Sequence, residues 1–72
     1  MTVTMTKVEL LKRMDECARL KFEDEEVFEY WLTYGVPDGS DEEDLIELAN
    51  DHETWVDIVK CFTECAQRAG II

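Results

Sequence analysis

Apolar side chains recur at helical spacing from the seventh residue onward, first at Val8, Leu11, Met14, Cys17 and Ala18. Steps of three and four positions are typical of one face of an amphipathic helix. Thr6 lies three residues before Glu9, and this pair forms a capping box, in which each side chain pairs with the other residue's backbone N–H. We therefore predict a first helix over about residues 7–21.

A second helix is predicted over about residues 25–34. Asp24 is a favourable N-cap and Gly35 is a favourable residue after the last turn, because each suits the backbone at its end of a helix. The apolar and aromatic residues of this segment surround most of the helix: Val27, Phe28, Tyr30, Trp31, Leu32 and Tyr34. A helix with this pattern is buried on more than one side.

The second half of the chain predicts two further helices. Pro37 and Gly39 form a turn, and Ser40 with Glu43 is a second capping box that predicts a short helix through residue 49. Asp51 caps a fourth helix that ends at Gly70. Its apolar stripe is Trp55, Val59, Phe62 and Ala66, flanked by Ile58 and Cys65.

These segments predict an all-α fold, a compact bundle of three or four short helices. The 72 residues are sufficient for one small domain. Residues 2–6 alternate between polar and apolar side chains, as in a strand. Because a single short strand has no obvious partner, we interpret residues 1–6 as a flexible or extended tail.

Charge narrows the classes of partner. The chain has 18 acidic and 7 basic side chains, a formal net charge of -11, with 46% apolar residues. The apolar content argues against intrinsic disorder, and the charge disfavours direct binding to nucleic acid or to an anionic membrane. The sequence lacks a secretory signal and an apolar run of the roughly 20 residues that span a bilayer. We expect a soluble cytoplasmic protein.

The negative charge is concentrated in the middle of the sequence. Residues 22–59 contain fourteen acidic side chains and no Lys or Arg, whereas residues 1–21 carry a net charge of +2 and residues 60–72 a net charge of +1. One interpretation is a solvated acidic face that maintains solubility. A second is that carboxylates about 5–6 Å apart on helices imitate the phosphates of a nucleic-acid strand.

In size, charge and helicity the chain is similar to the nucleic-acid-mimic inhibitors made by phages and mobile elements, including anti-CRISPR and anti-restriction proteins. The resemblance implies a non-enzymatic inhibitor or regulator that occupies a basic nucleic-acid-binding site on a partner protein. The residues expected to contact such a partner are Glu23, Asp24, Glu26, Glu29, Tyr30, Asp38, Asp41, Glu42, Glu43, Asp44, Glu47, Asp51 and Glu53.

The sequence predicts no catalytic residue, cofactor or metal ligand. His52 and Glu53 begin a zinc-protease pattern, but Val56 stands where its second histidine is required. The only histidine and the three cysteines lack the spacing of a zinc finger. The odd number of cysteines favours reduced thiols, and Cys61 and Cys65, one helical turn apart, are expected to face the core.

The aromatic residues suggest a different class of function. Phe28, Trp31 and Tyr34 are interpreted as core residues, while Tyr30, together with Trp31, is the candidate for an interface, since Tyr and Trp are enriched at binding hot spots. The alternative function is therefore a helical self-assembly or docking module that uses the Tyr30/Trp31/Tyr34 cluster, for example as a homodimer. A third alternative, a neutraliser of a basic toxin, shares the electrostatics of the mimic.

Overall fold

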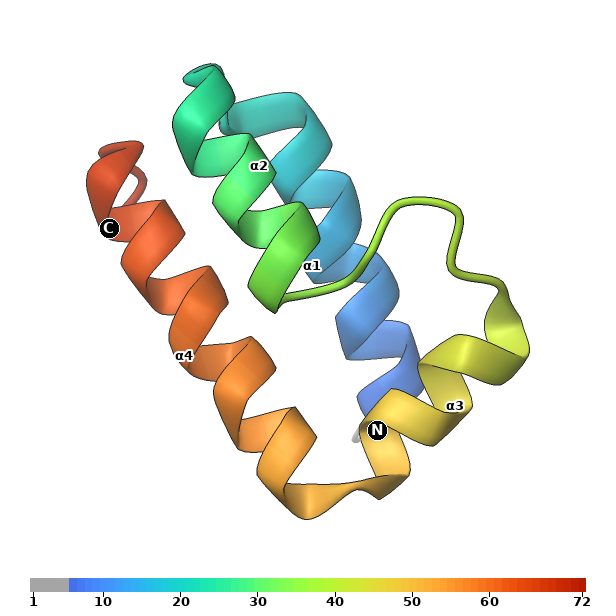
Figure 1. Cartoon of the computed structure of the whole chain (residues 1–72). Coiled ribbons are helices and arrows are strands. Elements are labelled where there is room, and N and C mark those ends of the chain that lie inside the picture. The colour runs from blue at the N-terminus through green and yellow to red at the C-terminus, as the bar shows by residue number, and fades with distance from the viewer. Residues whose placement is uncertain (1–5) are drawn as a thin grey trace, which may run out of the picture.

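The computed structural model describes residues 6–72, and the helices found there are α1 (Lys7–Lys21), α2 (Glu25–Tyr34), α3 (Glu42–Asn50) and α4 (His52–Arg68) (Figure 1). No strand occurs in that range. The predicted all-α bundle is confirmed. Of the tail expected for residues 1–6, residues 1–5 lie outside the described residues, and Thr6 is the N-cap of α1.

The first two helices have the bounds that their capping residues predict. Thr6 Oγ1 accepts a hydrogen bond from the backbone N–H of Glu9 at 3.2 Å, and Asp24 Oδ1 accepts one from Glu26 at 2.9 Å. The predicted end of α2 at Gly35 is right, and its backbone N–H donates to the Trp31 carbonyl at 2.8 Å. Its predicted role is wrong, because Gly35 has a φ of -103° and not the left-handed conformation of a glycine that follows a helix; the adjacent Trp31 ring leaves no room for a side chain there. Each side-chain acceptor satisfies a backbone donor that has no partner within its own helix.

The predicted cap of α3 is wrong by one residue. Ser40 Oγ donates to the Pro37 carbonyl at 2.7 Å, so its side chain stabilises the preceding turn. Asp41 is the N-cap, and it forms a reciprocal box with Asp44 through hydrogen bonds of 2.9 and 3.3 Å. Because an aspartate is at least as good an N-cap as a serine, the adjacent Asp41 takes this role. Asp51 caps α4, as predicted.

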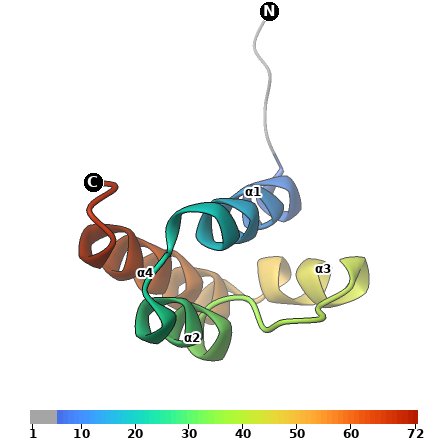
Figure 2. The ribbon, with the colours of Figure 1, turned by 90° about the horizontal axis from the view of Figure 1, so that it is seen from above.

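The four helices enclose one core (Figures 1 and 2). α2 and α4 lie side by side and run in opposite directions, and α1 packs across them. The short α3 packs against α1 and α4 but not against α2. This arrangement separates the acidic residues of α2 from those of α3.

Trp31 occupies the centre of the core. It is fully buried, and its ring lies 6.5 Å from that of Phe22 and 5.5 Å from that of Phe62, both edge to face. Its Nε1–H donates to Asp15 Oδ1 at 3.2 Å, which satisfies the indole donor. No polar or charged residue is buried within residues 6–72. Burial of apolar surface therefore supplies most of the stability of this core.

Two core predictions need correction. Tyr34 is 61% exposed, and Val36, at 2% exposed, is buried near the same end of α2. The reason is that α2 ends at Gly35 and the chain turns back toward the core. On α4, Val59 is 37% exposed, whereas Cys61 and Cys65 are buried as free thiols, as predicted. The buried face of α4 is rotated away from the expected stripe because the helix packs mainly against α2, and also against α3 and α1.

Candidate functional site

The acidic middle of the chain is entirely at the surface. All fourteen acidic side chains of residues 22–59 are exposed. Two of them form ion pairs in the described structure, Asp38 with Arg19 at 2.7 Å and Glu42 with Lys12 at 3.1 Å. The other twelve have no cationic partner within residues 6–72, so the protein itself leaves most of this charge uncompensated.

The residues predicted to contact a partner fall into two groups that lie at different ends of the molecule. The first group lies at and just before the start of α2, at the top of Figure 1. Glu23 and Asp24 precede the helix, and Glu26 and Glu29 lie in its first half. The second group surrounds α3 and the start of α4, toward the bottom and right of the same view. We call it the α3–α4 acidic surface, and it consists of Asp38, Asp41, Glu42, Glu43, Asp44, Glu47, Asp51 and Glu53.

The carboxylates of α2 and those of α3 do not form one continuous row, because these helices are not in contact. Tyr30 belongs to neither group. It is half-buried beside α4, and its hydroxyl donates to Glu64 Oε2 at 3.3 Å. The structure therefore places eight of the thirteen predicted residues on α3 and the segments that flank it.

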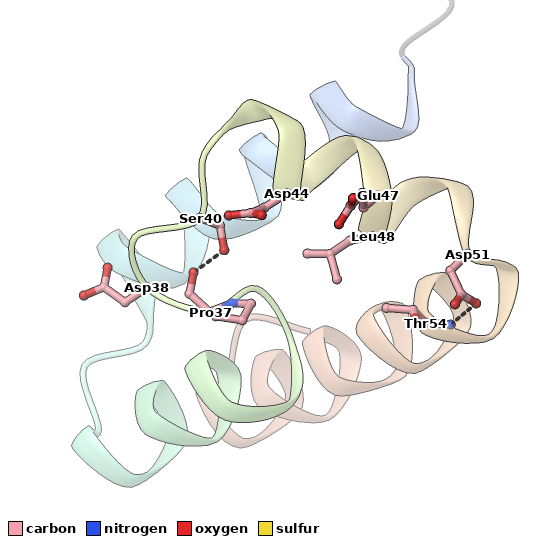
Figure 3. Close-up of a pocket in the computed structure, with 8 residues that line it drawn as sticks. All are labelled: Pro37, Asp38, Ser40, Asp44, Glu47, Leu48, Asp51 and Thr54. Carbon is pink, nitrogen blue, oxygen red and sulfur yellow. Dashed lines mark hydrogen bonds between the residues drawn. The ribbon is translucent and has the colours of Figure 1, made fainter.

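An open hollow of about 480 Å³ lies within the α3–α4 acidic surface (Figure 3). Its walls come from the α2–α3 loop, α3 and the start of α4, and the side chain of Leu48 points into it. The lining residues are Pro37, Asp38, Ser40, Asp44, Glu47, Leu48, Asp51 and Thr54. The hollow thus combines an apolar patch with carboxylates at its border.

Local hydrogen bonds fix three of these carboxylates. Asp44 belongs to the capping box of α3, and Asp51 Oδ1 accepts from the backbone N–H of Thr54 at 3.3 Å. Asp38 is paired with Arg19, and hydrogen bonding to that guanidinium lowers the pKa of Asp38. The Glu47 side chain has no hydrogen-bond or ion-pair partner in the described structure. The hollow accordingly offers negative charge at positions set by the fold.

This arrangement suits the recognition of cationic groups. Ionised carboxylates accept hydrogen bonds from Lys and Arg, and such charge-assisted bonds are stronger than neutral ones. Within residues 6–72, no three His, Cys, Asp or Glu side chains are placed to hold a metal ion. In the same range, no helix is both long and apolar enough to cross a bilayer.

The two buried thiols join α4 to α2. The Sγ–H of Cys61 donates to the Tyr30 carbonyl at 3.8 Å and that of Cys65 to the Val27 carbonyl at 3.6 Å. Burial raises the pKa of Cys61 to about 12 and also raises the pKa of Cys65. Since the thiolate is the reactive form, these groups are packing residues at neutral pH.

The aromatic cluster is divided by the fold. Trp31 is fully buried and has no exposed surface to offer a partner. Tyr30 and Tyr34 instead border a second cavity, of about 330 Å³, with Asp57, Lys60, Cys61 and Glu64 of α4. Sequence reasoning missed the α4 side of this cavity. The spacing of Tyr30 and Tyr34, one helical turn apart, was the available signal for their shared face.

Comparison of the chain with protein families, with curated proteins and with solved structures gives no match.

Proposed function

We propose that this protein is a non-enzymatic inhibitor or regulator whose α3–α4 acidic surface occupies a basic nucleic-acid-binding site on a partner protein. The observation that carries the proposal is the uncompensated charge: fourteen exposed acidic side chains, of which twelve have no ion-pair partner in the described structure. A basic partner would supply the missing positive charge, and complementary charge accelerates association and selects the partner.

The spacing of the carboxylates supports imitation of a polyanion. Glu43 and Glu47 are one helical turn apart on the side of α3 away from the buried Leu45 and Ala49. Residues at this spacing lie about 5–6 Å from each other, and like charges there destabilise an isolated helix. An energetically unfavourable arrangement that no internal cation relieves is consistent with selection for binding.

The α3–α4 acidic surface is favoured over the acidic start of α2 for a physical reason. Negative charge in a first turn complements the helix dipole, which explains Glu25 and Glu26 of α2 and also the acidic first turn of α3. The difference between the two groups is Glu47. Glu47 lies near the C-terminal end of α3, where the dipole disfavours negative charge. Glu47 also borders the hollow.

Affinity capture followed by a displacement assay tests the proposal. The immobilised protein is exposed to a lysate of the cells that carry its gene. The captured proteins are then purified, and a fluorescent DNA or RNA duplex is bound to them. We expect the chain to displace the duplex, with an apparent Kd that rises strongly between about 50 and 500 mM salt, since exposed charges are screened over this range. Displacement that is insensitive to salt contradicts the electrostatic mechanism.

Two double variants with the same change of charge locate the binding surface. Glu43→Gln with Glu47→Gln neutralises the α3 face, while Glu9→Gln with Glu16→Gln neutralises two exposed residues of α1. We expect the α3 variant to weaken displacement and the α1 variant to change it much less. Equal effects would show that net charge, not this surface, determines binding.

Capture of a basic toxin that binds no nucleic acid would favour the alternative function, neutralisation of a basic toxin.

Self-association is the second candidate function, and the exposure of Tyr34 favours it. Tyr34 is 61% exposed, and it is the aromatic member of the exposed large hydrophobic residues in the described structure. Sedimentation velocity over a range of protein concentrations tests it. A dimer that persists at high salt and dissociates in Tyr34→Leu would support assembly. Trp31→Ala is unsuitable for this test because it removes a fully buried core residue.

A further inference from the structure

The cavity between α2 and α4 has a chemical character different from that of the α3–α4 acidic surface. Tyr30 and Tyr34 form its aromatic side, with ring centroids 4.7 Å apart. The other side is formed by α4, which contributes two exposed carboxylates, Asp57 and Glu64, and the buried Cys61. Electron-rich ring faces and carboxylates both attract a cation.

Tyr30, one of the lining residues, already lies against a guanidinium within the molecule. The Cζ atom of Arg68 lies 5.6 Å from the ring centroid of Tyr30. The Tyr30 hydroxyl is held by Glu64 at 3.3 Å, and the nearby Glu64 carboxylate raises the pKa of Tyr30. Tyr30 is therefore a fixed, neutral wall at physiological pH. Tyr34 has no such covering in the described structure, and its ring is the surface left open.

We propose that the cavity lined by Tyr30, Tyr34, Asp57 and Glu64 receives an arginine side chain of the basic partner, with the guanidinium against the Tyr34 ring. This inference rests on the proposed function, because it assumes a basic protein partner. It adds a specific contact that lies outside the α3–α4 acidic surface.

Arginine fits the cavity better than lysine does. The guanidinium is planar and weakly hydrated, so it stacks on an aromatic face while its N–H groups reach carboxylates at the edge. An ammonium group is compact and strongly hydrated, and it gains less from the ring. The internal contact between Arg68 and Tyr30 is an example of the same pairing.

Replacing Lys60 should change the affinity for a cation in the opposite direction to replacing Tyr34. It lines the cavity between Asp57 and Glu64 and forms no ion pair within residues 6–72. Its ammonium group repels an entering cation. Replacing it with glutamine should therefore tighten binding, beyond the general effect of removing one positive charge.

The experiment uses the full chain and two defined probes, a hexapeptide of arginine and a hexapeptide of lysine, at matched ionic strength. Binding is followed by amide chemical shifts in nuclear magnetic resonance spectra. We expect the arginine probe to bind more tightly and to shift the amides around Tyr34, Lys60 and Glu64. Tyr34→Leu should raise the Kd for the arginine probe about two- to fivefold, the range of a solvent-accessible cation–π contact.

Matched variants separate this contact from general electrostatics. Tyr34→Phe retains the ring and should leave the Kd for the arginine probe unchanged. Lys60→Gln should lower that Kd more than Lys21→Gln, which removes the same charge from an exposed position on α1. Since Tyr34 and Lys60 are both exposed, melting curves are expected to show that these variants remain folded.

The inference is overturned if Tyr34→Leu leaves the Kd unchanged or weakens both probes equally. It is also overturned if Lys60→Gln and Lys21→Gln have the same effect. These outcomes are distinct from failure of the proposed function. If the chain displaces nucleic acid from a captured partner and Tyr34→Leu has no effect, only the arginine contact is wrong. If the probes behave as expected and no captured partner binds nucleic acid, only the proposed function is wrong.

Discussion

Replacing Glu47 with glutamine should make the protein more stable and, under the proposed function, should weaken its binding to a basic partner. Glu47 has two acidic neighbours on α3, Glu43 four residues before it and Asp44 three residues before it. It also lies in the last turn of the helix, which ends at Asn50 and carries no basic residue there. Each of these features disfavours a negative charge at this position.

The expected gain in the free energy of unfolding is about 1 kcal/mol. Each like-charge pair at this spacing costs about 0.2–0.5 kcal/mol, and a negative charge near the C-terminal end of a helix costs about 0.3–1 kcal/mol. For a domain of this size, a gain of 1 kcal/mol raises Tm by about 4–8 °C. Because the charges are exposed, most of the gain should disappear in about 1 M salt.

Glu16→Gln is the matched control, since it removes the same charge from another exposed helical glutamate. The neighbours of Glu16 are basic: Lys12, Arg13 and Arg19 lie three or four residues away. Its loss should lower Tm slightly. Circular dichroism melting curves at low and high salt measure both variants. If both raise Tm equally, overall net charge and not local repulsion limits the stability, and the reasoning about α3 is refuted.

Three further predictions test the core, an ion pair and the thiols. Gly35→Ala should lower the free energy of unfolding by about 1–3 kcal/mol, because the added methyl would lie 2.5 Å from Cζ3 of the fully buried Trp31. Urea unfolding should show a smaller loss for Gly39→Ala, because there the methyl meets open space and only the positive φ of 80° is unfavourable. Arg19 lowers the pKa of Asp38 from its ordinary 3.8, so the ion pair stabilises the fold above pH 3.8 and this stability is lost as the pH falls through the lowered pKa. The difference in stability between the wild type and Asp38→Asn should therefore shrink in that acidic range. Iodoacetamide should modify the half-buried Cys17 before Cys61, whose pKa is raised to about 12 by burial, as mass spectrometry of the folded protein would show.

Local sequence signals predict most of the helix bounds but not how deeply each face is buried. The bounds of α1 and α2 follow from Thr6, Asp24 and Gly35, because capping depends on residues adjacent in sequence. The start of α3 was harder to predict because Ser40 and Asp41 compete for one role. Exposure of Tyr34 depends on the direction of the chain after α2, which no local pattern determines.

The candidate site could be predicted only in part for the same reason. That the acidic residues are exposed follows from the cost of burying a charge. Their division between two ends of the molecule follows from α3 packing against α1 and α4 but not α2. The cavity at Tyr34 requires α2 and α4 to lie side by side. Such contacts link residues about thirty positions apart, and periodicity along one helix carries no information about them.

The basic helix α1 explains how the fold tolerates a net charge of -11. Its cations neutralise only the inner edge of the acidic region: Lys12 holds Glu42 at the start of α3, and Arg19 holds Asp38 in the preceding loop. Arg19 also binds Asp15, which accepts the hydrogen bond of Trp31. These pairs connect the acidic loop to the core without covering the outer face of α3. Under the proposed function, a basic partner would contact that face without disrupting an ion pair that the fold uses.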